Sequence, residues 1–127
     1  MPSPQGFWPA FWTFQPPGAN YYVETDVYEF YSNNHFLMNL TQHGGTGGGC
    51  QNFNLGYDAT LAYHTYGADI ESTGTTWYFD GNKVCQTTST SNNLGAVITN
   101  LAVYSTIPPA STTTTATKKV DYIRVWQ

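Results

Sequence analysis

The sequence predicts one all-β domain, an antiparallel β-sandwich. Gly, Pro, Asn, Ser and Thr recur roughly every 8–12 residues between short aromatic or β-branched runs, which is the spacing of strands in a sandwich or barrel. Amphipathic helical periodicity is almost absent. The 127 residues are enough for a single domain, residues 1–127, with one core.

Turn residues bound eight segments of strand composition. Residues 77–84 predict a β-hairpin, because Asp80-Gly81 is a favoured two-residue turn. A Pro-Pro-Gly turn at 16–18 separates the first two segments, which are therefore expected to pair as antiparallel neighbours. The predicted strands are 6–14, 21–31, 36–42, 62–70, 75–80, 83–85, 95–104 and 119–126.

Two stretches are predicted to be loops. Residues 43–49 are rich in glycine, but they lack the Lys-Ser/Thr ending and the following helix of a phosphate-binding loop, so we expect a flexible loop at the rim of a cleft. Residues 111–117 are polar and of low complexity. Since a predicted strand follows them, we expect a surface loop rather than a linker between domains.

The second predicted strand carries three of the chain's eight acids, Glu24, Asp26 and Glu29. Side chains alternate between the two faces of a strand, so Glu24 and Asp26 share a face and Glu29 would point away. A β-bulge at Val27-Tyr28 would bring Glu29 back to their face. The sequence therefore predicts one row of three carboxyl groups.

Such a row suits cleavage of a glycosidic bond with retention, in which one carboxylate attacks the anomeric carbon and a second donates and then accepts a proton. Crowding raises the free energy of ionising all three, so at least one is expected to stay protonated near neutral pH. The alternative is a solvated edge strand whose charges discourage aggregation.

Composition favours a neutral polymer as partner. Charged residues make up 9% of the chain and aromatic residues 17%. A net charge of -4 with four basic residues argues against nucleic acid, which needs a cationic surface. No stretch reaches the roughly 18 apolar residues of a membrane span. Sugar rings pack on aromatic planes and hydroxyls bond to polar side chains, although many of these aromatics are expected to fill the core.

Five segments in order carry a family resemblance. The first is Gly6-Phe7-Trp8-Pro9-Ala10-Phe11-Trp12, and it is followed by the acidic strand, His64-Thr65-Tyr66-Gly67 with 76–81, Asn100-Leu101-Ala102-Val103, and 120–126. Together they resemble glycoside hydrolase family 16, the laminarinase, lichenase and agarase group. The resemblance implies a concanavalin A-like jelly roll and a secreted endo-β-glycan hydrolase that acts with retention on laminarin, β-glucan or agar-type polysaccharide.

The same resemblance implies roles for individual residues. Glu24 matches the nucleophile, Asp26 the assisting acid and Glu29 the general acid/base. Asp121 matches an aspartate that binds structural calcium in some members, and no other cofactor is implied. The residues implied to bind substrate are Trp8, Trp12, His43, Asn100, and Tyr21 or Tyr22, which stand where the family usually has Trp-Pro.

The chain is short for this family, and the resemblance implies that roughly the first half of the usual sandwich lies outside it. The sandwich is therefore expected to be truncated, or completed by another chain, either as part of a longer protein or through self-association of copies. Three functions stay open: the hydrolase, a glycan-binding relative without activity, and a structural subunit that self-assembles.

Cys50 and Cys85 are the two cysteines. An extracellular, oxidising location favours a disulfide between them. A metal site with His43 has no CxxC-type spacing to support it, and two free thiols are the remaining alternative.

Overall fold

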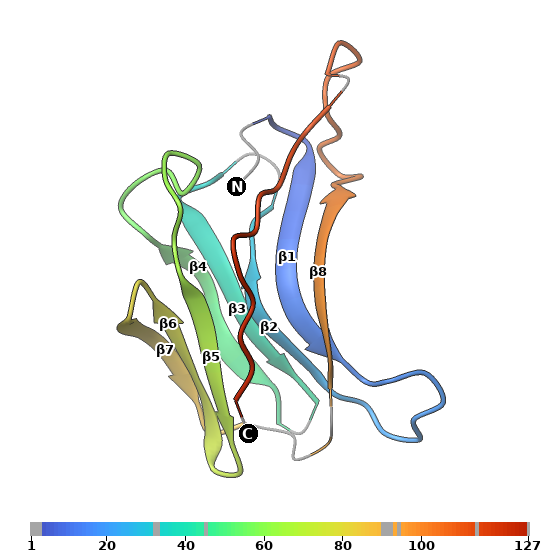
Figure 1. Cartoon of the computed structure of the whole chain (residues 1–127), viewed down its shortest axis with the longest axis vertical. Coiled ribbons are helices and arrows are strands. Elements are labelled where there is room, and N and C mark those ends of the chain that lie inside the picture. The colour runs from blue at the N-terminus through green and yellow to red at the C-terminus, as the bar shows by residue number, and fades with distance from the viewer. Residues whose placement is uncertain are drawn as a thin grey trace.

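The computed structural model describes residues 4–31, 34–44, 46–89, 93, 95–113 and 115–126. In this part of the chain eight antiparallel strands form two sheets and there is no helix, so none that could cross a membrane (Figure 1). The all-β sandwich prediction is confirmed. The strands are β1 (Phe7–Phe14), β2 (Glu24–Glu29), β3 (Leu37–His43), β4 (Gly48–Asn54), β5 (Tyr66–Glu71), β6 (Gly74–Phe79), β7 (Asn82–Thr87) and β8 (Ala96–Val103).

The two sheets differ in width. The first has the order β4-β3-β2-β1-β8 and the second the order β5-β6-β7. The sheets meet where β7 contacts β4 and where β5 contacts β2. The three-stranded sheet therefore covers β4, β3 and β2, while β1 and β8 extend beyond it (Figure 1).

The core lies between the overlapping parts of the sheets. Trp77, Phe30, Met38 and Leu40 are at most 1% exposed. Full burial of each such side chain contributes about 1.5–3 kcal/mol. The Trp77 indole also donates a hydrogen bond of 2.8 Å to the backbone oxygen of Asp26, so the core fixes the acidic strand from behind.

The predicted bulge in β2 is confirmed. On β3, the partners of Asp26 and Glu29 are separated by one residue, Leu40, whereas Val27 and Tyr28 separate the two acids on β2. Two residues thus oppose one, and the alternation of faces is reset. Asp26 and Glu29 consequently line the same cavity on one side of the sheet.

Two more local predictions are confirmed. The hairpin joins β6 to β7, and Asp80 and Gly81 have φ angles of 48° and 78°. Positive φ at both central residues is the requirement of a type I′ turn. The disulfide Cys50–Cys85 links β4 to β7 and so joins the two sheets.

The prediction of a flexible glycine-rich loop over 43–49 was wrong in part, because β4 begins at Gly48. Glycine is required here for a close approach: a Cβ on Gly49, whose φ is 128°, would lie 2.0 Å from the backbone oxygen of Leu40 on β3. The glycines thus let β4 pair with β3 rather than breaking the sheet.

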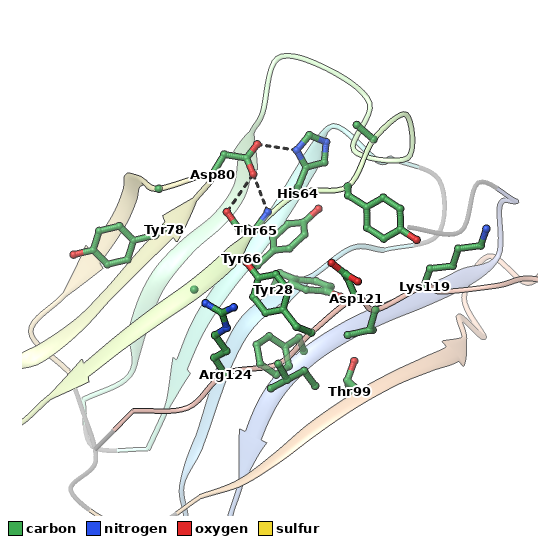
Figure 2. A pocket seen from close by; sticks show the side chains of 18 of the residues that line it. Tyr28, His64, Thr65, Tyr66, Tyr78, Asp80, Thr99, Lys119, Asp121 and Arg124 are labelled. Atoms are coloured by element: carbon green, nitrogen blue, oxygen red, sulfur yellow. Dashed lines mark hydrogen bonds and ion pairs between the residues drawn. The ribbon is translucent and has the colours of Figure 1, made fainter.

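The prediction of a strand at 119–126 was also wrong. These residues form no backbone ladder with any described residue. They line a cavity of about 430 Å³, and Phe11 and Tyr28 are among its other lining residues; Figure 2 shows Tyr28 there. A strand exists only by pairing, and no strand in the described part of the chain pairs with them. The predicted strands at 21–31 and 62–70 are shorter, beginning at Glu24 and Tyr66.

Candidate active site

The three predicted carboxyl groups lie on the side of the five-stranded sheet that faces away from the core. Glu24, Asp26 and Glu29 line one cavity of about 150 Å³. Its other walls are β1 and β8 residues, because β1 pairs with both β2 and β8. The lining is completed by Trp8, Ala10, Trp12, Asn100 and Ala102.

Glu29 is held by two donors. Trp8 Nε1 donates to Glu29 Oε1 and the Tyr31 hydroxyl to Glu29 Oε2, both at 2.9 Å. Burial raises the pKa of Glu29 above its ordinary value, and these two hydrogen bonds act in the opposite direction. A raised pKa is the property that general acid catalysis requires of a carboxyl group. Tyr31 was not predicted, although its position two residues after Glu29 was the available signal.

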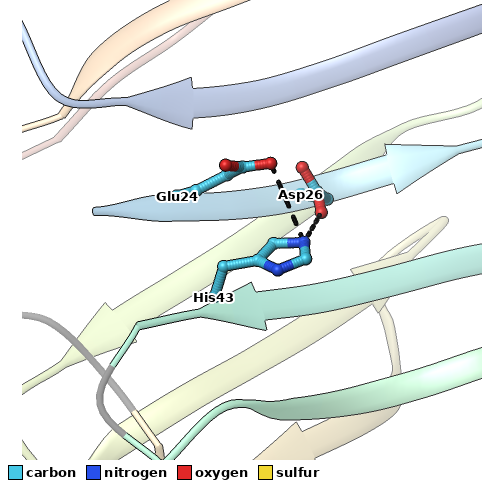
Figure 3. A group of neighbouring side chains, drawn as sticks. All are labelled: Glu24, Asp26 and His43. Carbon is cyan, nitrogen blue, oxygen red and sulfur yellow. Dashed lines mark hydrogen bonds and ion pairs between the residues drawn. The ribbon is translucent and has the colours of Figure 1, made fainter. Parts of the chain in front are cut away.

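Asp26 is the most buried of the three acids, at 2% exposed. His43 Nε2 on β3 lies 3.0 Å from Asp26 Oδ2, as Figure 3 shows. Burial, followed by the charge of Glu29, raises the pKa of Asp26 to about 7, while His43 lowers it. Asp26 thus takes up a proton near neutral pH, and this reduces the negative charge of the row.

Glu24 is the most accessible of the three. Its side chain is 20% exposed, and Oε1 lies 3.7 Å from His43 Nε2. The hydroxyl of Tyr22 donates to Glu24 Oε2 at 2.5 Å. This hydrogen bond, with burial, raises the pKa of Tyr22 to about 12, so the hydroxyl remains a donor at neutral pH. The arrangement leaves one face of the Glu24 carboxylate available to a ligand.

A buried amide supports the row from the core side. Gln42 Oε1 accepts hydrogen bonds from Thr25 (2.7 Å) and Thr75 (3.1 Å). Its Nε2 donates to the backbone oxygens of Glu24 (3.1 Å) and His43 (2.9 Å). The network joins β2, β3 and β6 and fixes the backbone that carries Glu24 and His43.

The predicted substrate-binding residues are only partly brought together. Trp8 and Trp12 stand on the cavity wall, and the Trp12 indole donates to Asn100 Oδ1 at 2.8 Å. Tyr22, 48% exposed, lies beside the cavity through its bond to Glu24. Tyr21 is not among the residues that line the cavity.

Three side chains could hold a cation. One carboxylate oxygen each from Glu24 and Asp26 and one nitrogen of His43 lie within 4.8 Å of one another. Two carboxylates with an imidazole suit a divalent transition metal. The hydrogen bond between His43 and Asp26 accounts for the same geometry without one. Asp121 belongs to no such group in the described part of the chain, and calcium there stays a prediction.

A row of carboxyl groups on a bulged strand, bordered by tryptophan, is the kind of site that retaining glycoside hydrolases use. The family model described as glycosyl hydrolases family 16 matches residues 1–124. The chain belongs to this family.

Solved structures agree with this fold. A native glycosidic hydrolase is 26% identical over 88% of this chain and 50% of its own, with a TM-score of 0.69. The β-glucanase of Bacillus licheniformis shares the fold: it is 24% identical over 87% of this chain and 50% of its own, with a TM-score of 0.69. The endo-β-1,3-glucanase of Pyrococcus furiosus also shares it, at 24% identity over 88% of this chain and 51% of its own, with a TM-score of 0.70. The chain thus spans about half the length of these structures. No curated protein matches it closely enough to add to this comparison.

Proposed function

We propose that this chain carries the catalytic carboxyl groups of an endo-acting β-glycan hydrolase that retains anomeric configuration. The supporting observation is the placement of Glu24, Asp26 and Glu29 in one cavity on a single strand. The substrate class we propose is a neutral β-glucan of the laminarin or mixed-linkage type, with agar-type polysaccharide as the alternative. The similarity to an endo-β-1,3-glucanase and to a laminarinase catalytic domain from Thermotoga maritima supports the glucan.

In the proposed mechanism Glu24 attacks the anomeric carbon, because it is the most accessible acid of the row. Glu29 donates its proton to the leaving oxygen, forming a covalent glycosyl-enzyme, and then accepts a proton from the water that hydrolyses it. Asp26, which is hydrogen-bonded to His43 and has a raised pKa, limits the negative charge between Glu24 and Glu29. Trp8 and Trp12 offer aromatic surface to the sugar rings.

The test compares Glu24→Gln with the wild type on laminarin, lichenan and agarose. We expect Glu24→Gln to abolish the release of reducing ends while the circular dichroism spectrum is unchanged. Glu71→Gln is the matched control, since Glu71 is an exposed acid on β5. NMR of the first product should show the β-anomer. Equal cleavage by Glu24→Gln, or an α-anomer as first product, would contradict the mechanism.

A second candidate is glycan binding without cleavage. Trp8 and Trp12 offer sugar-binding surface beside the carboxyl groups, while the chain spans about half the length of the similar hydrolase structures. Under this proposal glycan affinity survives Glu24→Gln and Glu29→Gln, and the wild type releases no reducing ends. Affinity electrophoresis in laminarin gels separates the two candidates.

Three further expectations from the sequence stay proposals. Secretion fits the disulfide, because disulfides persist in oxidising compartments. Self-association as a structural subunit predicts oligomers in light scattering, and a monomer at micromolar concentration would contradict it. Calcium at Asp121 predicts a melting temperature that falls on adding a chelator in the wild type but not in Asp121→Asn.

A further inference from the structure

Three aromatic rings pack together at one end of the five-stranded sheet, beside Glu29. They belong to Trp8 on β1, to Tyr31, which lies two residues after β2, and to Tyr104, which directly follows β8. The ring centroids are 5.2 Å apart for Trp8 and Tyr31, 5.5 Å for Tyr31 and Tyr104, and 5.9 Å for Trp8 and Tyr104. Each ring thus packs on the other two, and we call the three the aromatic triad.

The alternation of side chains along a strand explains why the triad lies on the outer face of the sheet. Ala102 on β8 pairs with Trp8, and both line the cavity of the carboxyl groups. Residues two apart point to the same face, so Tyr104 follows Ala102 on that face and Tyr31 follows Glu29. The triad is therefore separate from the buried core cluster, to which none of its members belongs.

Two members of the triad hold the same carboxyl group. Trp8 Nε1 donates to one oxygen of Glu29 and the Tyr31 hydroxyl to the other, each at 2.9 Å. Burial, followed by the charge of Glu29, raises the pKa of Tyr31, so its hydroxyl remains a donor. Packing alone does not require two polar atoms to converge on one carboxyl group. With both oxygens bonded, the plane of the Glu29 carboxyl group is fixed.

Tyr104 packs on both of these donors. Its ring is stacked on that of Tyr31, with an angle of 29° between the planes, and meets the Trp8 ring nearly at right angles, at 86°. Stacked and edge-to-face arrangements are the favourable geometries of aromatic pairs. One ring therefore restrains the two side chains that bond to Glu29.

The backbone of Tyr104 is itself held in place. Its N–H donates to the backbone oxygen of Gly6 at 2.8 Å, just before β1 begins. Gly6 has a φ of 96°, and a Cβ there would lie 2.0 Å from the backbone nitrogen of Pro109. Glycine thus permits the chain after β8 to lie against the start of β1, and this close approach fixes Tyr104 over Trp8.

The charged groups that act on Glu29 come from other positions. After burial, which raises the pKa of Glu29, and the two hydrogen bonds, which lower it, His43 on β3 lowers it and Glu24 on β2 raises it. Glu29 in turn raises the pKa of Asp26 on β2, although burial of Asp26 is the larger cause. Strands β1 and β8 carry no charged residue. A substitution at Tyr104 therefore leaves these charges in place.

We propose that Tyr104 is a positioning residue that holds Trp8 and Tyr31 in the geometry in which both donate to Glu29. The Glu29 carboxyl group is thereby kept in one orientation, which the proton transfer to the leaving oxygen requires. The consequence for catalysis rests on the proposed function. The hydrogen bonds themselves exist without substrate and can be measured in its absence.

The test compares Tyr104→Leu with the wild type, because leucine keeps an apolar side chain but removes the ring. In NMR without substrate, we expect the Trp8 indole N–H to exchange about tenfold faster, since its bond to Glu29 is loosened. The pKa of Glu29 should rise by about half a pH unit as its two donors withdraw. In kinetics on laminari-oligosaccharides, kcat should fall about tenfold with KM unchanged.

Two variants serve as comparisons. Tyr104→Phe keeps the ring and should match the wild type in indole exchange and in the pKa of Glu29. Tyr63→Leu makes the same substitution at a tyrosine that is 69% exposed and does not line the cavity of the carboxyl groups, so it should change neither. If Tyr104→Leu does not fold, Tyr104→Met removes the ring with a more adaptable side chain and provides the same measurements.

A double mutant tests the route of the effect. Because Tyr104 acts in part through Tyr31, Tyr104→Leu should shift the pKa of Glu29 less in a Tyr31→Phe background than in the wild type. Equal shifts in both backgrounds would overturn the proposal, as would unchanged indole exchange in Tyr104→Leu. A change in KM alone would also overturn it and assign Tyr104 to sugar binding. If the wild type releases no reducing ends, the proposed function fails, and the NMR measurements still decide the role of Tyr104.

Discussion

His43 Nε2 lies 3.0 Å from Asp26 Oδ2, and the contact joins β3 to β2 beneath the neighbouring carboxylates. It is the one partner of the Asp26 carboxylate among the described side chains, and it does not offset the burial of that group. The acid is therefore held in a site that favours its neutral form. This property can be measured without any substrate.

Stability should fall as pH rises from about 4 toward neutrality, because Asp26 has a pKa of about 7 in the fold. The pKa of Asp26 is about 7 in the fold, compared with about 4 in an unfolded chain. The folded state therefore binds more protons between these values, and its stabilising contribution is present below pH 4 and lost as pH rises toward 7. We expect a loss of about 2–4 kcal/mol in the free energy of unfolding from this group.

Denaturant titrations at a series of pH values check this, with Asp26→Asn as the comparison. The variant should lose this component of the pH dependence and should exceed the wild type in stability near pH 8. Asp69→Asn is the control, since Asp69 is exposed on β5. Parallel pH profiles for wild type and Asp26→Asn would refute the assignment.

Tyr22→Phe should lower kcat/KM, because the hydroxyl of Tyr22 is hydrogen-bonded to the proposed nucleophile, Glu24. The variant keeps the ring but removes the hydroxyl that donates to Glu24. A hydrogen bond to a charged group contributes about 1.5–3 kcal/mol, and the half-exposed position of Tyr22 reduces this, so we expect a fall of about tenfold. Separate measurement of kcat and KM on laminari-oligosaccharides tests it, with Tyr21→Phe as control. An effect on KM alone would assign Tyr22 to substrate stacking.

Trp8→Phe and Tyr31→Phe should each move the basic limb of the pH–rate profile to higher pH. Both residues donate to Glu29 and so lower its pKa, and removing either donor raises that pKa further. A general acid with a higher pKa keeps its proton to higher pH. Trp12→Phe is the matched control, because its indole donates to Asn100 instead of a carboxylate. If the basic limb of the pH–rate profile stays at the same pH in both variants, Glu29 is not the general acid.

Local chemistry made the sheets and the acidic row predictable from the sequence. Asp80-Gly81 specifies its turn by two positive φ angles. The spacing of Asp26 and Glu29 required a bulge if both were to share a face, and the register shows it. Each of these features depends on residues that lie close together in the sequence.

Other features depended on neighbours that are distant in sequence. Residues 119–126 have strand composition but pair with no described strand, so a prediction from composition alone was wrong there. Gly48 and Gly49 have the composition of a loop, and only their pairing with Gln42 and Thr41 of β3 makes them part of a strand. The sequence also did not show which aromatic residues donate hydrogen bonds to Glu24 and Glu29, because it contains many of them. Only the fold brings Tyr22, Trp8 and Tyr31 to these carboxyl groups.

The disulfide should be a major source of stability because it joins the sheets where they overlap. Cys50 and Cys85 are separated by 35 residues, and closing a loop of this length contributes about 3–4 kcal/mol by restricting the unfolded chain. We expect the variant with both cysteines replaced by serine to lose this amount in guanidinium titrations. Adding a reductant should lower the free energy of unfolding of the wild type toward that of the variant. The free energy of unfolding of the variant should not change. A loss below about 1 kcal/mol would mean that contacts between β4 and β7 hold the sheets together without the covalent link.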